Sequence, residues 1–431
     1  VTLVQNTLIC SGKSLSKVIK QKIDKNKVFY VIAPNAQLIE QDTFYEYHKL
    51  RWIYTPNLQT IKASAFCNCF SLFQIVGDKI QTIEKSGLSG CVPLSKISLN
   101  NLVMIECESL AYCVSLQIFE ANKLKAFPHH AFVQSESLLY VNCDNLSNAD
   151  DILERQDRLG YIHLPLATNI KLDTKAAVKS DVNNFENCQL IDKMPSIEEL
   201  QEFRFNKHNK IQQEHLFNSD SLLNIPFSIR GLVLRKVETI TEKAFENQKQ
   251  LLFAICPVVR EVESFAFAYC LSMRRFIAKN LEIIQRYAFK HCMSLTEITA
   301  QNVTSCESNS FECCHSLVEL NFNKLETIPD KLFYYCKALI QLNCPNLKEV
   351  NLKAINSCSE VQITSPIHND LKYNSVVAST KKIRFQEVLV DRFRERDNLI
   401  KTVQRSHQLA KTRNHSFKTM KRVQQESKNV H

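Results

Sequence analysis

The sequence predicts an α/β repeat solenoid, in which short stacked coils each add a strand to a parallel sheet. Three observations support this fold class. A large apolar residue recurs every twenty-two residues, and further columns of leucine, isoleucine and cysteine keep the same spacing. Glycine occurs only six times in 431 residues, which leaves little material for glycine-rich nucleotide-binding loops. With 45% apolar and 23% charged residues, the chain can still bury a substantial core.

The repeat is clearest in a column of mostly phenylalanine, here called the Phe column. Its members are Phe44, Phe66, Leu88, Leu110 and Phe132, followed by Phe245, Phe267, Phe289, Phe311, Phe333 and Ile355. Three positions later stands a cysteine column, made of Cys69, Cys91, Cys113, Cys270, Cys292, Cys314, Cys336 and Cys358. One repeat has too few apolar residues to bury its own face, so the units must stack on their neighbours and share a continuous core.

Each repeat divides into a strand and a turn. The segment LTEITA at residues 295–300 alternates inward and outward residues, as a short strand does. The Ala-Phe-x-x-Cys segment on the opposite side is expected to form a turn or short helix. Asparagine recurs thirteen residues after the Phe column, at Asn57, Asn101, Asn145, Asn280, Asn302 and Asn346. We expect these amides to form a ladder that satisfies backbone groups at the corner after the strand.

These repeats resemble the BspA-like family of leucine-rich repeats over roughly residues 28–363. The sequences IKASAFCNCFSLFQI at 61–75 and IIQRYAFKHCMSLTEI at 283–298 carry the resemblance. It implies a right-handed leucine-rich-repeat superhelix that binds other molecules, as the surface adhesins of this family do. The chain departs from the family pattern where glycine is expected before the cysteine, because Asn68, Tyr112, Tyr269 and His291 stand there.

Five segments are expected along the chain. They are an N-terminal cap at 1–27, a first repeat block at 28–163, a degenerate repeat or hinge at 164–206, a second block at 207–365 and a basic helical tail at 366–431.

Residues 381–431 hold 14 Lys and Arg against 5 Asp and Glu, a net of +9 out of +10 for the whole chain. A C-terminal helix over about 381–410 would cap the last coil. Self-association, an anionic membrane and nucleic acid are the alternatives, all acting through this tail alone.

The seventeen cysteines are read mainly as structural residues, since eleven of them fall in repeat columns. The pairs Cys67 with Cys69 and Cys313 with Cys314 lack the second ligand pair of a structural zinc site, so no metal is expected. We favour reduced thiols and a cytoplasmic location over a disulfide ladder between coils. The sequence begins with Val1, and a missing N-terminal signal would instead place the protein at the cell surface.

No catalytic motif is present. The sequence contains no G-x-S-x-G, no G-x-x-x-x-G-K-[ST], no G-x-G-x-x-G and no H-E-x-x-H. The pair His129 and His130 stands in the variable half of a coil and is read as incidental. We therefore expect no enzyme activity, no cofactor and no small-molecule substrate.

The remaining interpretation is a non-enzymatic protein-binding or scaffold protein that uses an extended repeat surface. The outward residues of adjacent strands would supply this surface, since solenoids bind over continuous faces. The candidate partner-binding residues are Tyr140, Arg274, Arg275, Glu297 and Glu319. The partner is a protein of unknown identity. A cell-surface adhesin of the same fold, or association through the basic tail, are the alternative functions.

Overall fold

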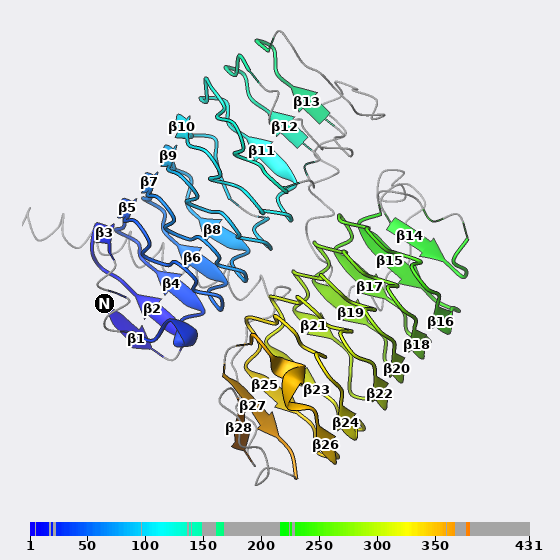
Figure 1. Ribbon diagram of the computed structural model, residues 1–431. Coiled ribbons are helices and arrows are strands. Elements are labelled where there is room, and N and C mark those ends of the chain that lie inside the picture. Colours follow the sequence, from blue (N-terminus) through cyan, green and yellow to red (C-terminus); the bar gives the residue numbers. More distant parts are fainter. Residues whose placement is uncertain are drawn as a thin grey trace, which may run out of the picture. The chain divides into compact units, whose positions relative to one another are not determined.

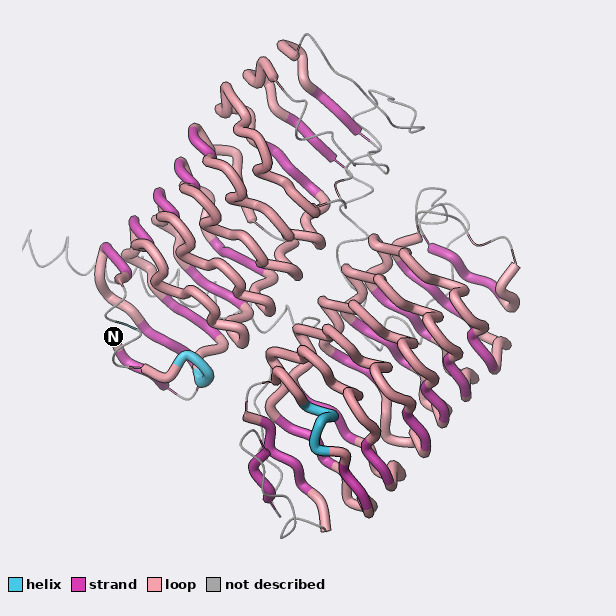
Figure 2. The backbone as a smooth tube through the Cα atoms, viewed as in Figure 1, coloured by secondary structure: helices cyan, strands magenta, loops and turns pink. Residues whose placement is uncertain are grey.

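Two blocks of stacked coils make up the described part of the chain (Figures 1 and 2). The computed structural model describes residues 1–148 except 5, 17–18, 20–22, 96, 136–137 and 139, and then 161–167, 216–223, 225, 229–366 except 359, and 376–379. Both blocks belong to one compact unit, Val1–Lys193 with Asn206–Ile383. The stacking of coil on coil, with parallel strands in register, confirms the predicted solenoid.

Coils of the first block contribute to parallel sheets on two sides. One sheet contains β1 (Thr2–Val4), β2 (Thr7–Ile9), β4 (Tyr30–Ile32), β6 (Trp52–Tyr54) and β8 (Gln74–Val76). The second contains β3 (Ser14–Leu15), β5 (Leu38–Ile39), β7 (Thr60–Ile61), β9 (Thr82–Ile83) and β10 (Met104–Ile105). Strands β11 (Ile118–Glu120), β12 (Tyr140–Asn142) and β13 (Tyr161–His163) form a third. Neighbouring strands pair in parallel at the repeat spacing, as Ile53 with Ile75, except that β1 is antiparallel to β2.

The second block repeats this arrangement. Its larger sheets contain β14 (Leu216–Ser219), β15 (Gly231–Leu234), β17 (Phe253–Ile255), β19 (Arg275–Ile277) and β21 (Glu297–Ile298), and then β23 (Glu319–Asn321), β25 (Gln341–Asn343), β27 (Val361–Thr364) and β28 (Val376–Ser379). The opposite side holds β16 (Thr239–Ile240), β18 (Glu261–Val262), β20 (Ile283–Ile284) and β22 (Ser305–Cys306), with β24 (Thr327–Ile328) and β26 (Glu349–Val350). This second line of strands was not predicted from the sequence, which indicated one strand in each coil.

The Phe column forms the shared core. Each of its side chains is 5% exposed or less. Successive rings stack face to face, with centroids 5.2 to 5.6 Å apart and interplanar angles of 2° to 15° in the pairs from Phe44 to Phe66 and from Phe245 to Phe333. Inward strand residues close the core from the side, as Phe276 does with its ring edge-on to Phe289 at 5.0 Å. One coil therefore completes the core of the next.

Turns, rather than α-helices, carry the Ala-Phe-x-x-Cys segments. Every positive-φ residue of the described chain stands two positions before or two positions after the Phe column. In the coil of Phe289 these are Tyr287 at φ 60° and His291 at φ 57°. Two left-handed residues four positions apart interrupt the right-handed dihedrals that a helix needs. Among the described residues, the helical elements are the 3₁₀ helices η1 (Lys25–Lys27) and η2 (Leu352–Ile355).

The cysteine column ties each coil to the preceding one. Each of its eight thiols donates a hydrogen bond to the backbone carbonyl of the Phe-column residue one coil earlier, at 3.0 to 3.4 Å. Cys314, for example, donates to Phe289. Burial raises the pKa of six of these thiols, to about 12 at Cys113 and Cys358. The other four are Cys91, Cys292, Cys314 and Cys336. A buried, protonated thiol is small enough for the core and still supplies a donor, which explains why cysteine occupies this column.

The asparagine ladder is present in the structure. Side-chain amides donate to a turn carbonyl twenty-three residues earlier, in the preceding coil, at 2.6 to 2.9 Å. The donors are Asn57, Asn101, Asn145, Asn302 and Asn346. The prediction is confirmed for these five, and the bonded groups are the corner carbonyls that no strand partner reaches.

Replacing Asn302 with alanine should lower the free energy of unfolding by about 1 kcal/mol, because the carbonyl of Lys279 loses its donor at 2.9 Å. Chemical denaturation of the purified variant would measure the change. The neighbouring exposed Gln301→Ala is the control and should stay close to the wild type. An unchanged denaturation midpoint for Asn302→Ala would show that the asparagine ladder does not contribute to stability.

The structure describes only part of the segments expected at the two ends of the chain and between the blocks, and their division stays a prediction. Residues 1–27 were expected to cap the first coil; β2 and β3 extend the two sheets of the first block, and β1 closes the end of one of them. The expected hinge at 164–206 lies outside the described residues beyond residue 167. In the region expected as a helical tail, β28 (Val376–Ser379) pairs in parallel with β27. The predicted helix over 381–410 lies outside the described residues.

Candidate binding surface

The predicted partner-binding residues lie at the starts of strands in three different sheets. Tyr140 begins β12, Arg275 and Glu297 begin the neighbouring strands β19 and β21, and Glu319 begins β23. The structure brings two of them together, since Nε of Arg275 lies 2.8 Å from a carboxylate oxygen of Glu297. Arg274 donates to the hydroxyl of Ser95 in the first block.

Burial limits how much of this set faces solvent. Arg274 and Arg275 are 5% and 2% exposed, and Tyr140 is 8% exposed. The side chain of Glu297 keeps an exposed fraction of 27%. Alternation along a strand identified the outward side, but it could not show which outward residues would be covered by other coils. Partner contact by these five residues remains a prediction.

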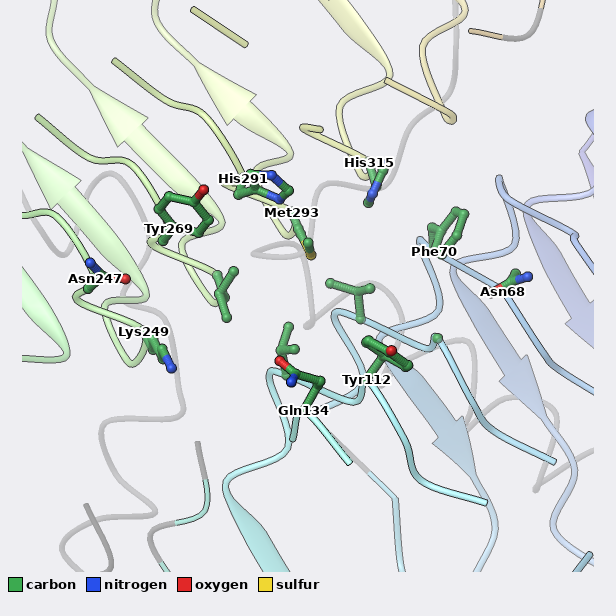
Figure 3. Close-up of a pocket in the computed structure, with 14 residues that line it drawn as sticks. Asn68, Phe70, Tyr112, Gln134, Asn247, Lys249, Tyr269, His291, Met293 and His315 are labelled. Carbon is green, nitrogen blue, oxygen red and sulfur yellow. The ribbon is translucent and has the colours of Figure 1, made fainter. Parts of the chain in front are cut away.

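A pocket of about 510 Å³ lies elsewhere, against the turns that follow the Phe column (Figure 3). Its lining consists of residues two and four positions after that column, here called the plus-two and plus-four columns. The plus-two residues are Asn68, Gly90, Tyr112, Gln134, Asn247, Tyr269 and His291, and the plus-four residues are Phe70, Val92, Val114, Lys249, Leu271, Met293 and His315. Coils of both blocks therefore contribute equivalent positions to one cavity.

Backbone conformation explains why the plus-two side chains project from the coil. Each plus-two residue lining the pocket has φ between 57° and 74°. Glycine is the residue best suited to that region, and a bulky side chain there is disfavoured by about 1 kcal/mol or more. Only Gly90 follows that preference, where an added Cβ would lie 2.7 Å from Oδ1 of Asn68. Tyr112 and Tyr269 occupy left-handed positions in spite of the strain.

Aromatic and imidazole rings are concentrated along the lining. The rings of Tyr269 and His291 stack at 4.8 Å, 8° from parallel. Phe70 lies between two imidazoles, 5.0 Å from His48 and 4.7 Å from His315. Burial lowers the pKa of all three histidines, to about 4 for His315, whose Nδ1 lies 2.8 Å from the carbonyl oxygen of Tyr335. Neutral imidazoles therefore line this part of the surface at physiological pH.

Sequence reasoning missed these two columns because it looked for binding residues on the strands. The available signal was the scarcity of glycine before the cysteine column, where Gly90 alone follows the family pattern. Tyrosine, histidine and asparagine in a position that the family pattern gives to glycine indicate side chains that contribute something beyond the turn. Their convergence on one cavity, however, depends on coils that are far apart in the chain.

The family-model comparison agrees with the coil geometry. The BspA-type leucine-rich repeat region matches residues 29–151, 168–274 and 260–383 in six copies. The chain belongs to the BspA-type leucine-rich repeat family. In this BspA-type protein, each repeat is one coil of twenty-two residues, and the cysteine column ties each coil to the one before it. No curated protein matches its sequence.

Solved structures of leucine-rich-repeat proteins are similar to this BspA-type chain at low identity. A leucine-rich cell-surface protein from Faecalibacterium prausnitzii is 15% identical, covering 73% of this chain and 87% of its own, with a TM-score of 0.28. A leucine-rich repeat protein from Bacteroides ovatus is 19% identical, covering 78% and 86%, with a TM-score of 0.29. The pneumococcal vaccine antigen PcpA is 14% identical, covering 83% and 80%, with a TM-score of 0.31. Values this low carry no inference about ligands.

Membrane insertion by a helix has no support in the described residues. None of the helices found there combines the length and the hydropathy that crossing a bilayer requires.

Proposed function

We propose that the chain is a non-enzymatic protein-binding protein of scaffold type, which holds a segment of its partner on the plus-two and plus-four columns. The observation that carries the proposal is the convergence of equivalent aromatic, amide and apolar side chains from coils of both blocks on one pocket. Tyr112 and Tyr269 line it from left-handed positions, at φ 59° and φ 61°, from which their rings project out of the turns. Repeat solenoids bind their partners over such repeated surfaces.

The chemistry of the pocket suits a polypeptide segment. Amides at Asn68, Gln134 and Asn247 can bond to backbone groups, while Leu271 and Met293 offer apolar contact. Tyr112 is 51% exposed and so remains accessible to a partner. A volume of about 510 Å³ is within the range of ligand-binding pockets, which is roughly 300 to 1,000 Å³.

The location is part of the same proposal. The eight thiols of the cysteine column donate to carbonyls as reduced cysteines. This supports a reducing compartment such as the cytoplasm. A cell-surface adhesin of the same fold is the alternative, and the BspA-type repeat is compatible with both.

Glycine substitutions test the proposal without damaging the fold. In Tyr112→Gly combined with Tyr269→Gly, relief of strain opposes the added freedom of the unfolded chain, so stability should stay within about 1 kcal/mol of the wild type. Affinity purification from extracts of the native cell, with quantitative mass spectrometry, should recover one protein with the wild type and at least tenfold less of it with the variant.

The matched control places glycine at left-handed positions on the other side of the turn. Ser86 at φ 53° and Glu108 at φ 57° stand two residues before the Phe column and do not line the pocket. The variant Ser86→Gly with Glu108→Gly should recover the partner as the wild type does. Equal recovery by both double variants would refute the proposed surface.

A further inference from the structure

Three side chains that commonly bind metals meet where two adjacent turns of the second block stack. They are His291, from the coil of Phe289, and Glu312 and Cys313, from the next coil. Their ligand atoms all lie within 4.8 Å of one another, and all three residues are half-buried. We propose that His291, Glu312 and Cys313 form a zinc-binding site, with nitrogen, oxygen and sulfur ligands and a fourth position open to water or to a partner's side chain.

The repeat itself creates this juxtaposition. His291 and Cys313 occupy the plus-two column of adjacent coils, with φ values of 57° and 61° that turn both side chains the same way. The amide of His291 donates to the carbonyl of Glu312 at 2.8 Å, which locks the two turns together. A search for ligands within one linear stretch could not find this set, because the imidazole and the thiol stand twenty-two residues apart.

The donor set favours zinc over the other common divalent ions. Thiolate and imidazole are soft or borderline ligands that calcium and magnesium avoid, whereas zinc accepts sulfur, nitrogen and oxygen together. Three protein ligands with one open position is an established zinc arrangement. Ligand atoms around tetrahedral zinc lie about 3.5 Å apart, so the three side chains need to close by roughly 1 Å.

Neighbouring groups already orient two of the ligands. Asn309 donates through Nδ2 to Oε2 of Glu312 at 3.0 Å, which leaves Oε1 for the metal. Stacking on Tyr269 at 4.8 Å holds the plane of the His291 ring. Partners of this kind fix ligand geometry in metal sites, and removing one weakens metal binding by roughly 10- to 100-fold.

Lys290 places a positive charge beside the carboxylate of Glu312. Nζ of Lys290 lies 3.4 Å from Oε1 of Glu312, and 4.8 Å from the centroid of the Tyr287 ring. The ion pair balances the carboxylate without metal, and the ring face stabilises the same ammonium through a cation–π contact. Burial raises the pKa of the Cys313 thiol to about 11, so metal binding at neutral pH must release the thiol proton to the solvent.

Cobalt(II) is the probe that tests the site, because a thiolate ligand gives it a charge-transfer absorption band. The reduced full-length protein should develop this band with one Co²⁺ per chain, and Zn²⁺ should displace it. Cys313→Ser should lose the band, whereas His291→Gln and Glu312→Gln should bind Co²⁺ at least tenfold more weakly. The matched control is Cys67→Ser, which removes a half-buried thiol of the first block and should leave the band unchanged.

Lys290→Met should change Co²⁺ affinity in the opposite direction to the ligand variants. It keeps the inference testable if one of those variants folds poorly. Removing the competing ammonium should tighten Co²⁺ binding by roughly tenfold, since the charge stands within 4 Å of a ligand oxygen. A band that survives in Cys313→Ser, or affinity that does not rise in Lys290→Met, would overturn the site. Metal uptake needs no protein partner, so failure of the proposed function would leave this result standing.

Discussion

Replacing Phe289 with alanine should lower the free energy of unfolding by about 3 to 5 kcal/mol. The ring is fully buried and stacks on Phe267 at 5.5 Å and on Phe311 at 5.6 Å, with Phe276 edge-on at 5.0 Å. Truncation therefore removes transfer free energy and leaves a cavity lined by rings that the two adjacent coils hold in place. Urea denaturation followed by circular dichroism would measure the loss.

The same change at a ring outside the core provides the control. Phe265 is half-buried and packs against Tyr287 in a tilted contact at 4.9 Å. Phe265→Ala should cost about 1 kcal/mol or less. Because a repeat array can open coil by coil, hydrogen exchange should also show faster exchange in the coils of Phe267 and Phe311 for Phe289→Ala. Equal losses for Phe289→Ala and Phe265→Ala would contradict a shared aromatic core.

Acidification from about pH 8 to about pH 5 should destabilise the protein by about 2 kcal/mol through His315 alone. The pKa of this imidazole is lowered from 6.5 to about 4. Burial is the largest cause, the bond to the Tyr335 carbonyl opposes it, and nearby His291, His48 and Lys337 add to the lowering. As pH falls, His315 takes up a proton near pH 6.5 in the unfolded chain, but only near pH 4 in the folded chain. Stability is therefore complete above the unfolded pKa and is lost as pH falls toward the folded one.

Unfolding measured at both pH values in the wild type and in His315→Gln would isolate this contribution. The difference in stability between the two pH values should be about 2 kcal/mol smaller in the variant. His129→Gln, which removes an exposed imidazole, should keep the full wild-type difference. An identical pH dependence in all three proteins would show that His315 is not held neutral by its surroundings.

Sequence spacing was sufficient for the core and insufficient for the surface. Phe289 and Cys314 could be placed inside because their columns recur at a constant interval. Asn302 could be placed at a corner for the same reason. Arg274 and Arg275 were assigned to an outward face by alternation, but Ser95 and Glu297 engage their guanidinium groups, and both arginines are almost fully buried. Alternation identifies a face and cannot tell whether that face is covered.

The sequence by itself determined the coil, its period and the residues that fill it, because a core shared between neighbours depends only on which side chain recurs at each step. The tertiary structure alone decided the second line of strands, the left-handed turns and the pocket. The sign of φ at Tyr269 or His291 cannot be read from residue types that prefer the right-handed region. The meeting of His291 with Cys313 likewise depends on which turns stack in space, since the two stand one full coil apart.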